Sequence, residues 1–287
     1  MFNLVEVEFG AFVRQLQRAY RRNYGSFHPE IPDIIRWAAQ MALENIANSD
    51  ALYHNVEHTM LVTLVGQEIL RCKHIREGGV SSEDWLHVTI ALLCHDIGYV
   101  RGVCRQDDGG RYATGRDSPP IALPPGATDA ALTPYHVDRG KLFVGERFGG
   151  HPRIHVELLQ EYIEPTRFPV PLPEDPPEVG GYAAVVRAAD LIGQLSDPRY
   201  LLKIPALFAE FAETGVAQKL GFRHAGDLRA NYPGFYWKSV YPYVQRELGY
   251  LARTQNGQQI RANLFANVFT VEHELARDVS EPTVRTP

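Results

Sequence analysis

Apolar residues recur at helical spacing along most of this chain, and this periodicity constrains the fold more than any other feature. Phe9, Phe12 and Leu16, for example, share one face of an expected helix. Gly25 marks the end of that helix. The same spacing predicts further helices over about 33–47, 55–76, 82–98, 137–148, 154–164 and 182–195, and over parts of 198–214, 235–252 and 258–278. No convincing set of strands and no internal repeat accompanies them. The sequence therefore predicts an all-α fold.

Capping and turn residues delimit several of these helices. Pro32 suits the first turn of the second helix, and the segment SSED at 81–84 suits the N-terminal cap of the fourth. The helical pattern is absent from 101–135, which is rich in Gly, Pro, Asp and Arg. A structureless loop of this length is uncommon inside a compact domain and tends to be functional. A second, Pro-rich interruption covers 165–177, and a polar tail begins at Ser280.

Length and composition indicate one domain with a sizeable core. The chain has 287 residues, of which 45% are hydrophobic and 22% are charged. The formal net charge of -5 argues against a protein that binds a nucleic-acid duplex by neutralising its phosphates. A small anionic ligand remains compatible with this charge, because a bound metal ion can supply positive charge locally.

The cysteines and the N-terminus bear on the compartment. Cys72, Cys94 and Cys104 are odd in number and match neither a disulfide framework nor a paired zinc motif, so we expect free thiols. Cys94 lies in an apolar run and is expected in the core. The first ten residues carry acids where a signal peptide carries bases, and no apolar stretch approaches the roughly 18 residues that span a membrane. We expect a cytoplasmic protein without a membrane partner, and an oligomer is compatible with the sequence.

Histidines and aspartates placed at the ends of apolar helices form the chemically informative pattern. His54 and His58 are four residues apart at the start of an expected helix, so they share a face. His95 and Asp96 follow the apolar run TIALLC, and Asp190 lies in a similar apolar setting. Burying imidazoles and carboxylates is costly unless something compensates, and a divalent cation bound by both does so.

Each of these signals has a structural explanation when it is taken alone. His151 and His155 form a second pair at the same spacing, and they suit surface or capping positions beside Pro152. A His-Asp dipeptide can be a satisfied core pair, and an aspartate such as Asp190 is often structural. The combination of all three features, each embedded in an apolar helix, favours a shared metal ion.

The chain resembles the HD-domain superfamily of metal-dependent phosphohydrolases in three segments, YHNVEHT at 53–59, LCHDIG at 93–98 and ADL at 189–191. The first segment is closer to the cyclic-nucleotide phosphodiesterase branch than to most HD proteins. The resemblance covers about residues 50–200. It implies an HD-type helical bundle around one or two divalent metal ions, drawn from Mg, Mn, Fe, Zn and Ni. A single domain over 1–287 would then add N-terminal helices over 1–49 and C-terminal helices over 200–279 to this metal-binding core.

The resemblance also implies roles for individual residues. His58, His95, Asp96 and Asp190 would be metal ligands, and Asp96 would also bridge to a second ion and take part in catalysis. His54 matches the histidine that protonates the leaving oxygen. These roles agree with the chemistry, because a metal pair activates water against an anionic diester and a nearby imidazole can supply a proton near neutral pH. Glu57 could orient His54, or it could be an ordinary solvated residue of the helix.

Ligands for a second ion and contacts to substrate are less well marked. His136 opens a helix after the long loop, and Glu164 stands where a further histidine would be expected, so both are candidate metal ligands. Arg101 and Arg105 in the loop could grip phosphate, although exposed loop arginines are usually solvated. The phosphodiesterase pattern stops after Gly98.

Several residues could bind the base of a nucleotide, and the sequence favours none of them. The aromatic cluster over 232–243 could wall a base-binding pocket, although a C-terminal core cluster is the commoner role of such residues. The glutamine that clamps a purine in the phosphodiesterases has three candidates here, Gln194, Gln218 and Gln245.

The expected function is hydrolysis of a phosphate ester or phosphodiester. The expected substrate is a small phosphorylated molecule, preferably a nucleotide, and cyclic nucleotides are among the candidates. Two alternatives stay open. An HD-type di-iron oxygenase would need further histidine ligands, of which only His136 is evident. A non-catalytic HD module that binds a nucleotide or a partner protein would have no need of the charged cluster.

Overall fold

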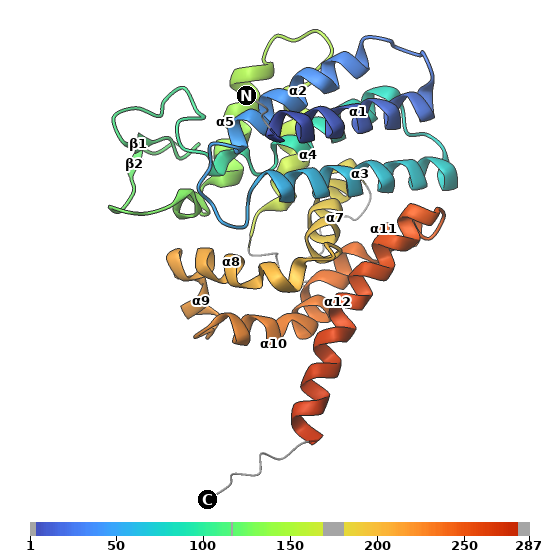
Figure 1. Cartoon of the computed structure of the whole chain (residues 1–287). Coiled ribbons are helices and arrows are strands. Elements are labelled where there is room, and N and C mark those ends of the chain that lie inside the picture. The colour runs from blue at the N-terminus through green and yellow to red at the C-terminus, as the bar shows by residue number, and fades with distance from the viewer. Residues whose placement is uncertain (1–3, 116, 169–180, 281–287) are drawn as a thin grey trace, which may run out of the picture.

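The computed structural model describes residues 4–115, 117–168 and 181–280 and confirms the all-α prediction (Figure 1). Most of the expected helices lie within one or two residues of their predicted ends. The helices are α1 (Leu4–Tyr24), α2 (Ile31–Ile46), α3 (Val56–Glu77), α4 (Ser82–Cys94), α5 (His136–Phe148), α6 (Val156–Ile163), α7 (Tyr182–Leu195), α8 (Tyr200–Glu213), α9 (Val216–Lys219), α10 (Ala225–Phe235), α11 (Tyr241–Leu251) and α12 (Gln255–Ser280). Short helical turns add η1 (Ile97–Tyr99), η2 (Asp129–Leu132), η3 (Glu164–Thr166) and the π-helical η4 (Tyr236–Val240). Helices α9 and α10 were not predicted.

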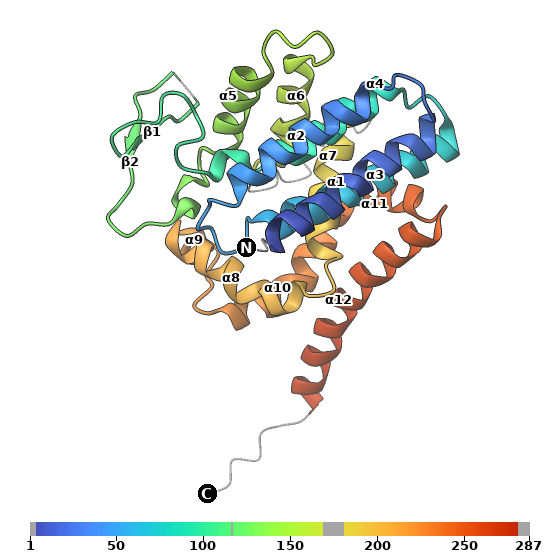
Figure 2. The ribbon, with the colours of Figure 1, turned by 45° about the horizontal axis from the view of Figure 1, so that its top comes forward.

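Helix α7 lies at the centre of the molecule. It packs most extensively on α3 and also contacts α4, α6, α11 and α12. Figures 1 and 2 show α1 to α6 gathered on one side of α7, and α8 to α12 on the other. Because α7 has apolar residues around most of its circumference, burial on several sides is the arrangement that its sequence favours.

Close packing of α3 on α7 depends on a glycine. A Cβ atom built on Gly193 would lie 2.8 Å from the Cα atom of Val62 and 3.0 Å from its Cγ2 atom. No side chain fits there, so the two backbones approach more closely than they otherwise could. This approach sets the separation of His58 on α3 from Asp190 on α7.

Caps determine where α3 and α4 begin. The side chain of Asn55 accepts hydrogen bonds from the backbone N–H groups of Glu57 and His58 and so caps α3. Ser81 and Asp84 form the expected capping box at the start of α4. All the residues of α4 from Trp85 to Cys94 are buried, so the helix carries the next two residues, a histidine and an aspartate, into the interior.

The segment 101–135 has more structure than its sequence indicates. It contains a small antiparallel hairpin of β1 (Arg111–Tyr112) and β2 (Ile121–Ala122), followed by η2. The hairpin projects beside α5 (Figures 1 and 2). Its base is held by Arg139, whose buried guanidinium donates to both carboxylate oxygens of Asp107 and to three backbone carbonyls.

Three further sequence predictions can be placed. Cys72, Cys94 and Cys104 are free, as expected, and all three are buried, whereas the sequence predicted burial for Cys94 only. Among the described helices, none is both long enough and apolar enough to cross a membrane. Most of the Pro-rich stretch 165–177 and nearly all of the polar tail from Ser280 lie outside the described residues.

Candidate metal centre and its cavity

Four of the predicted ligand side chains converge in the structure. His58 lies in the first turn of α3, His95 and Asp96 follow α4, and Asp190 is on α7. The two Nε2 atoms of the histidines are 3.3 Å apart, and Asp96 Oδ2 lies 3.2 Å from His58 Nε2 and 3.1 Å from His95 Nε2. Asp190 Oδ1 lies 3.4 and 3.6 Å from the same two nitrogens.

These distances fit ligands around one cation. Ligands about 2.1 Å from a metal ion stand about 3.0 Å apart when adjacent in an octahedron and about 3.4 Å apart in a tetrahedron. His58, His95 and Asp190 each offer a ligand atom within 4.8 Å of the other two. Asp96 falls outside that set of three, although its Oδ2 atom lies closer to both Nε2 atoms than Asp190 Oδ1 does.

The hydrogen-bonding pattern also fits a metal. Burial lowers the pKa of His95, but the carboxylates of Asp96 and Asp190 outweigh it and raise the pKa well above its usual range, so a metal ion would displace a proton from the ring. His95 Nδ1 is 2.7 Å from the carbonyl oxygen of Leu92, to which it donates, so the neutral ring carries its lone pair on Nε2. That lone pair faces His58 Nε2. Asp96 Oδ2 is buried and, despite its short distances to both imidazoles, accepts no well-directed hydrogen bond. Donor atoms that point at a shared position rather than at each other are what a cation requires.

The aspartates are in the charged form that binds metal. Burial by itself opposes their ionisation, but the neighbouring imidazoles outweigh it. They hold the pKa of Asp96 well below its usual range and lower that of Asp190 to about 2. Both side chains are therefore carboxylates at neutral pH, as metal coordination requires.

His54 does not join the cluster but lies beside it, held by a residue that the sequence analysis missed. Its Nδ1 atom is 2.5 Å from Oε2 of Glu210 on α8, and Glu210 also accepts the backbone N–H of Tyr53 at 2.7 Å. Burial alone would lower the pKa of His54, but the charge and hydrogen bond of Glu210 raise it to about 9. The signal for Glu210 was an acid on the apolar face of a helix, next to Leu207 and Phe211.

His136 is also brought to this region. Its Nδ1 atom is 2.6 Å from the carbonyl oxygen of Thr133, which leaves Nε2 without a proton when the ring is neutral. Burial lowers the pKa of His136, so the neutral form is favoured. His136 and His54 both stack on the ring of Tyr99, each with a centroid distance of 4.6 Å. Gly98 permits this arrangement, because a Cβ atom there would lie 1.9 Å from the carbonyl oxygen of His136.

Three other predicted site residues are not brought to the cluster. Glu164 is bound by Lys141 and Arg167 and is 43% exposed, so its carboxylate is engaged elsewhere. Arg101 pairs with two aspartates, at positions 50 and 129, rather than facing a ligand. Arg105 donates to the backbone carbonyl of residue 146 on α5. Ion pairs thus occupy Glu164 and Arg101, and a backbone hydrogen bond occupies Arg105.

The remaining alternatives can also be placed. Glu57 lies 2.9 Å from the amine of Lys203 and does not orient His54. His151 stacks on Trp37, away from the cluster. Among the three candidate glutamines, Gln194 lines the cavity described next, whereas Gln218 and Gln245 do not.

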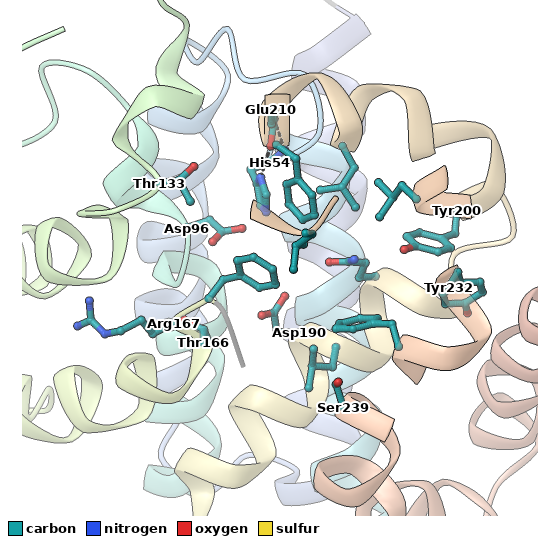
Figure 3. A pocket seen from close by; sticks show the side chains of 18 of the residues that line it. His54, Asp96, Thr133, Thr166, Arg167, Asp190, Tyr200, Glu210, Tyr232 and Ser239 are labelled. Atoms are coloured by element: carbon teal, nitrogen blue, oxygen red, sulfur yellow. Dashed lines mark hydrogen bonds and ion pairs between the residues drawn. The ribbon is translucent and has the colours of Figure 1, made fainter. Parts of the chain in front are cut away.

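A cavity of about 630 Å³ opens next to the cluster, between α7 and the helices α8 and α10 (Figure 3). Asp96, Asp190 and His54 point into it at one end, and Tyr200 and Tyr232 stand at the other. Its wall between these ends is largely apolar and includes Phe168, Leu191, Leu207, Phe211, Leu220, Phe222, Leu228 and Phe235. The site therefore offers a charged end and a large apolar chamber.

Comparison with known proteins gives the family. The family model described as Npun_R2479-like matches residues 2–274. The chain therefore belongs to the Npun_R2479-like family. Searches of curated proteins and of solved structures find no match.

Proposed function

We propose that this protein is a metal-dependent phosphohydrolase of the HD-domain type. Its substrate would be a phosphate ester or phosphodiester of a small molecule, with a nucleotide as the preferred candidate. The observation that carries the proposal is the convergence of His58, His95, Asp96 and Asp190 at one end of a cavity. Imidazole suits Zn, Fe and Ni, and carboxylate suits Mg and Mn, so the donor set is compatible with all five metals.

The four ligands would hold the ion, and the surrounding residues would orient the ligands. A bound divalent cation supplies Lewis acidity toward a phosphoryl oxygen and lowers the pKa of water. The carbonyl oxygen of Leu92 fixes the ring of His95, so the imidazole presents Nε2 without reorganisation. Because the ligands are buried, competing water is limited to the side that faces the cavity.

His54 would donate a proton to the leaving oxygen. An alkoxide is a poor leaving group, so hydrolysis of an alkyl phosphate needs this proton. Glu210 occupies Nδ1 of His54, which leaves Nε2 as the ring nitrogen that can serve the substrate. A carboxylate behind a catalytic histidine fixes its tautomer and orientation in the same way in hydrolytic triads.

His136 is the candidate ligand for a second ion, which Asp96 would bridge. It lines the same cavity, and its Nε2 lone pair is unused by the backbone contact that fixes the ring. Beyond the four ligands and His54, it is the one histidine in the described part of the cavity lining. This small number of histidines favours hydrolysis over the di-iron oxygenase alternative.

The direct test is metal-dependent turnover by the full chain. The purified protein is stripped with a chelator, reloaded separately with each of the five metals, and assayed with bis(p-nitrophenyl) phosphate. We expect no turnover without metal and recovery with at least one ion. His95→Ala should lose both metal and turnover, whereas the control His155→Ala should keep both, because His155 lies away from the cluster, where its ring stacks on His87.

Other outcomes would replace the proposal. Full turnover by the stripped protein would contradict a metal mechanism. Bound iron with oxygen consumption and no phosphoester hydrolysis would indicate the oxygenase. Stoichiometric metal without turnover of any phosphate ester would indicate the binding module.

A further inference from the structure

Arg187 is a buried cation that faces the cavity and has no carboxylate partner among the described residues. It lies on α7, is 3% exposed and belongs to the cavity wall. Its Nε atom has no hydrogen-bond partner, and no carboxylate among the described residues lies within 4.0 Å of its guanidinium. A buried charge left in this state is costly, and proteins usually pair it.

The neighbours of Arg187 compensate only part of that cost. Its guanidinium carbon lies 4.1 Å from the centroid of the Tyr243 ring, which is a favourable cation–π distance. Ring stacking leaves the in-plane N–H donors free, however, and these are the atoms that bind oxyanions. Glu247 on α11 attracts Arg187 electrostatically, but the two side chains are not within ion-pair distance of each other.

Arg167, the other arginine of the cavity wall, is different. Its guanidinium donates to both carboxylate oxygens of Asp138 and to those of Glu164. It points away from the centre of the cavity in Figure 3. Its charge is thus satisfied within the protein. Lys238 also lines the cavity but is exposed, so Arg187 is the buried one, with unused donors, among the arginines and lysines in the described part of the wall.

The position of Arg187 relates it to the metal ligands. It precedes Asp190 by three residues on the same helix, so both side chains lie on one face, about 5–6 Å apart at their Cβ atoms. An anion at Arg187 would therefore lie near the metal ligands but not among them. The apolar wall formed by Leu191, Leu207 and Phe211 borders the same space.

We propose that Arg187 binds an anionic group on a ligand whose apolar body fills this cavity. If the proposed function is right, that ligand is the substrate, which then carries a phosphate or carboxylate besides the ester that is hydrolysed. Binding of the anion itself needs no metal, so the two proposals can fail separately.

The experiment compares two fluorescent probes of nearly the same shape. One is 8-anilinonaphthalene-1-sulfonate, and the other is its neutral counterpart N-phenyl-1-naphthylamine. Both are titrated into the metal-stripped full chain, into Arg187→Gln and Arg187→Lys, and into the surface control Arg36→Gln. Arg36 lies on α2, is 52% exposed and is outside the cavity wall.

We expect the wild-type chain to bind the sulfonate at least about tenfold more tightly than the neutral probe. Arg187→Gln should remove most of that preference and leave the neutral probe within about twofold of wild type. Arg187→Lys should restore part of it, because the charge returns without the planar fork. Arg36→Gln should behave as wild type.

Equal affinity of the wild-type chain for both probes would overturn the proposal. This comparison uses no variant, so it remains decisive even if an Arg187 variant fails to fold. Unchanged sulfonate binding by a folded Arg187→Gln would also overturn it. Competition by phenyl phosphate and by benzoate then distinguishes the two anion classes, since the stronger competitor identifies the group that Arg187 accepts. Selective sulfonate binding by a protein that hydrolyses no phosphate ester would contradict the proposed function but still support an anion site at Arg187.

Discussion

Nδ1 of His54 lies 2.5 Å from Oε2 of Glu210, a residue 156 positions further along the chain. The pair joins the loop before α3 to α8 and closes one end of the cavity. Glu210 is 2% exposed, and besides His54 it binds the backbone N–H of Tyr53. The carboxylate therefore both positions the proposed proton donor and ties the two halves of the site together.

This relationship predicts coupled effects on turnover. His54→Ala should lower kcat by about 10²–10⁴-fold, the contribution typical of general acid catalysis. Glu210→Gln should lower it by about 10–100-fold, the usual effect of losing the partner of an active-site histidine. Neither variant should lose metal, because neither residue belongs to the four ligands.

The double variant distinguishes positioning from a structural role. If Glu210 acts through His54, the double variant should have the kcat of His54→Ala alone. Multiplication of the two losses would mean that Glu210 acts independently of His54, and would contradict the assignment. Metal content measured on all three proteins provides the control.

Glu247 gives a prediction about stability and pH. Its side chain is 2% exposed, Oε2 has no hydrogen-bond partner, and burial raises the pKa of its carboxyl from 4.5 to about 7. The folded state then binds the proton more tightly than the unfolded state does, so this group lowers stability as pH rises from about 4.5 to about 7. The full loss is on the order of 3 kcal/mol.

Glu247→Gln removes the ionisation and should abolish this loss. The variant should be more stable than wild type at pH 8 and nearly equal to it at pH 5, as measured by urea denaturation. The charged groups around Glu247 are Arg246, Arg187 and Lys73. A variant that is less stable than wild type at pH 8 would mean that one of these cations forms an ion pair with the carboxylate.

Arg139 should control the order of the segment 101–135. Its buried guanidinium donates to Asp107 at 2.9 and 3.0 Å and to the carbonyl oxygens of Gly98, Val100 and Ala113 at 2.6 to 2.8 Å. Arg139→Met leaves Asp107 as an unpaired buried charge, which typically costs about 3–5 kcal/mol.

Limited proteolysis measures the local part of that effect. In Arg139→Met, cleavage should begin within 101–135 before the helices are cut, whereas the wild-type chain should resist. The control Arg105→Met removes an exposed contact to the same segment and should change little. Simultaneous cleavage of helices and loop in Arg139→Met would show that Arg139 stabilises the whole fold rather than the loop.

The helices were predictable because apolar periodicity is a local property of the sequence. Phe9, Phe12 and Leu16 do face the core along α1, and the cap at Ser81 begins α4 where expected. Helix α10 was missed because its apolar residues are few. It also contains Pro233 near its end, and proline disfavours the interior of a helix.

The site was only partly predictable, for a related reason. His58, His95, Asp96 and Asp190 stood out because charged groups interrupt apolar helices, and the structure brings them together. Contacts between side chains that are far apart in the sequence produce no such local pattern.

The residues that were missed or misplaced illustrate this limit. Nothing near Glu210 in the sequence indicates His54. The pairing of Glu164 with Arg167 is local, but it competes with metal binding in a way that only the fold decides. The sequence presents Arg187 as an ordinary helical arginine, and only the structure shows that no carboxylate of the described residues forms an ion pair with it.

A crystal structure with anomalous data at the edge of the bound metal tests the central claim most directly. The account predicts a peak about 2.0–2.2 Å from Nε2 of His58, Nε2 of His95 and an oxygen of both Asp96 and Asp190. It also predicts that the peak disappears in Asp96→Ala crystals grown with the same metal. A protein that binds no metal at this position, or that keeps full occupancy without Asp96, would contradict it.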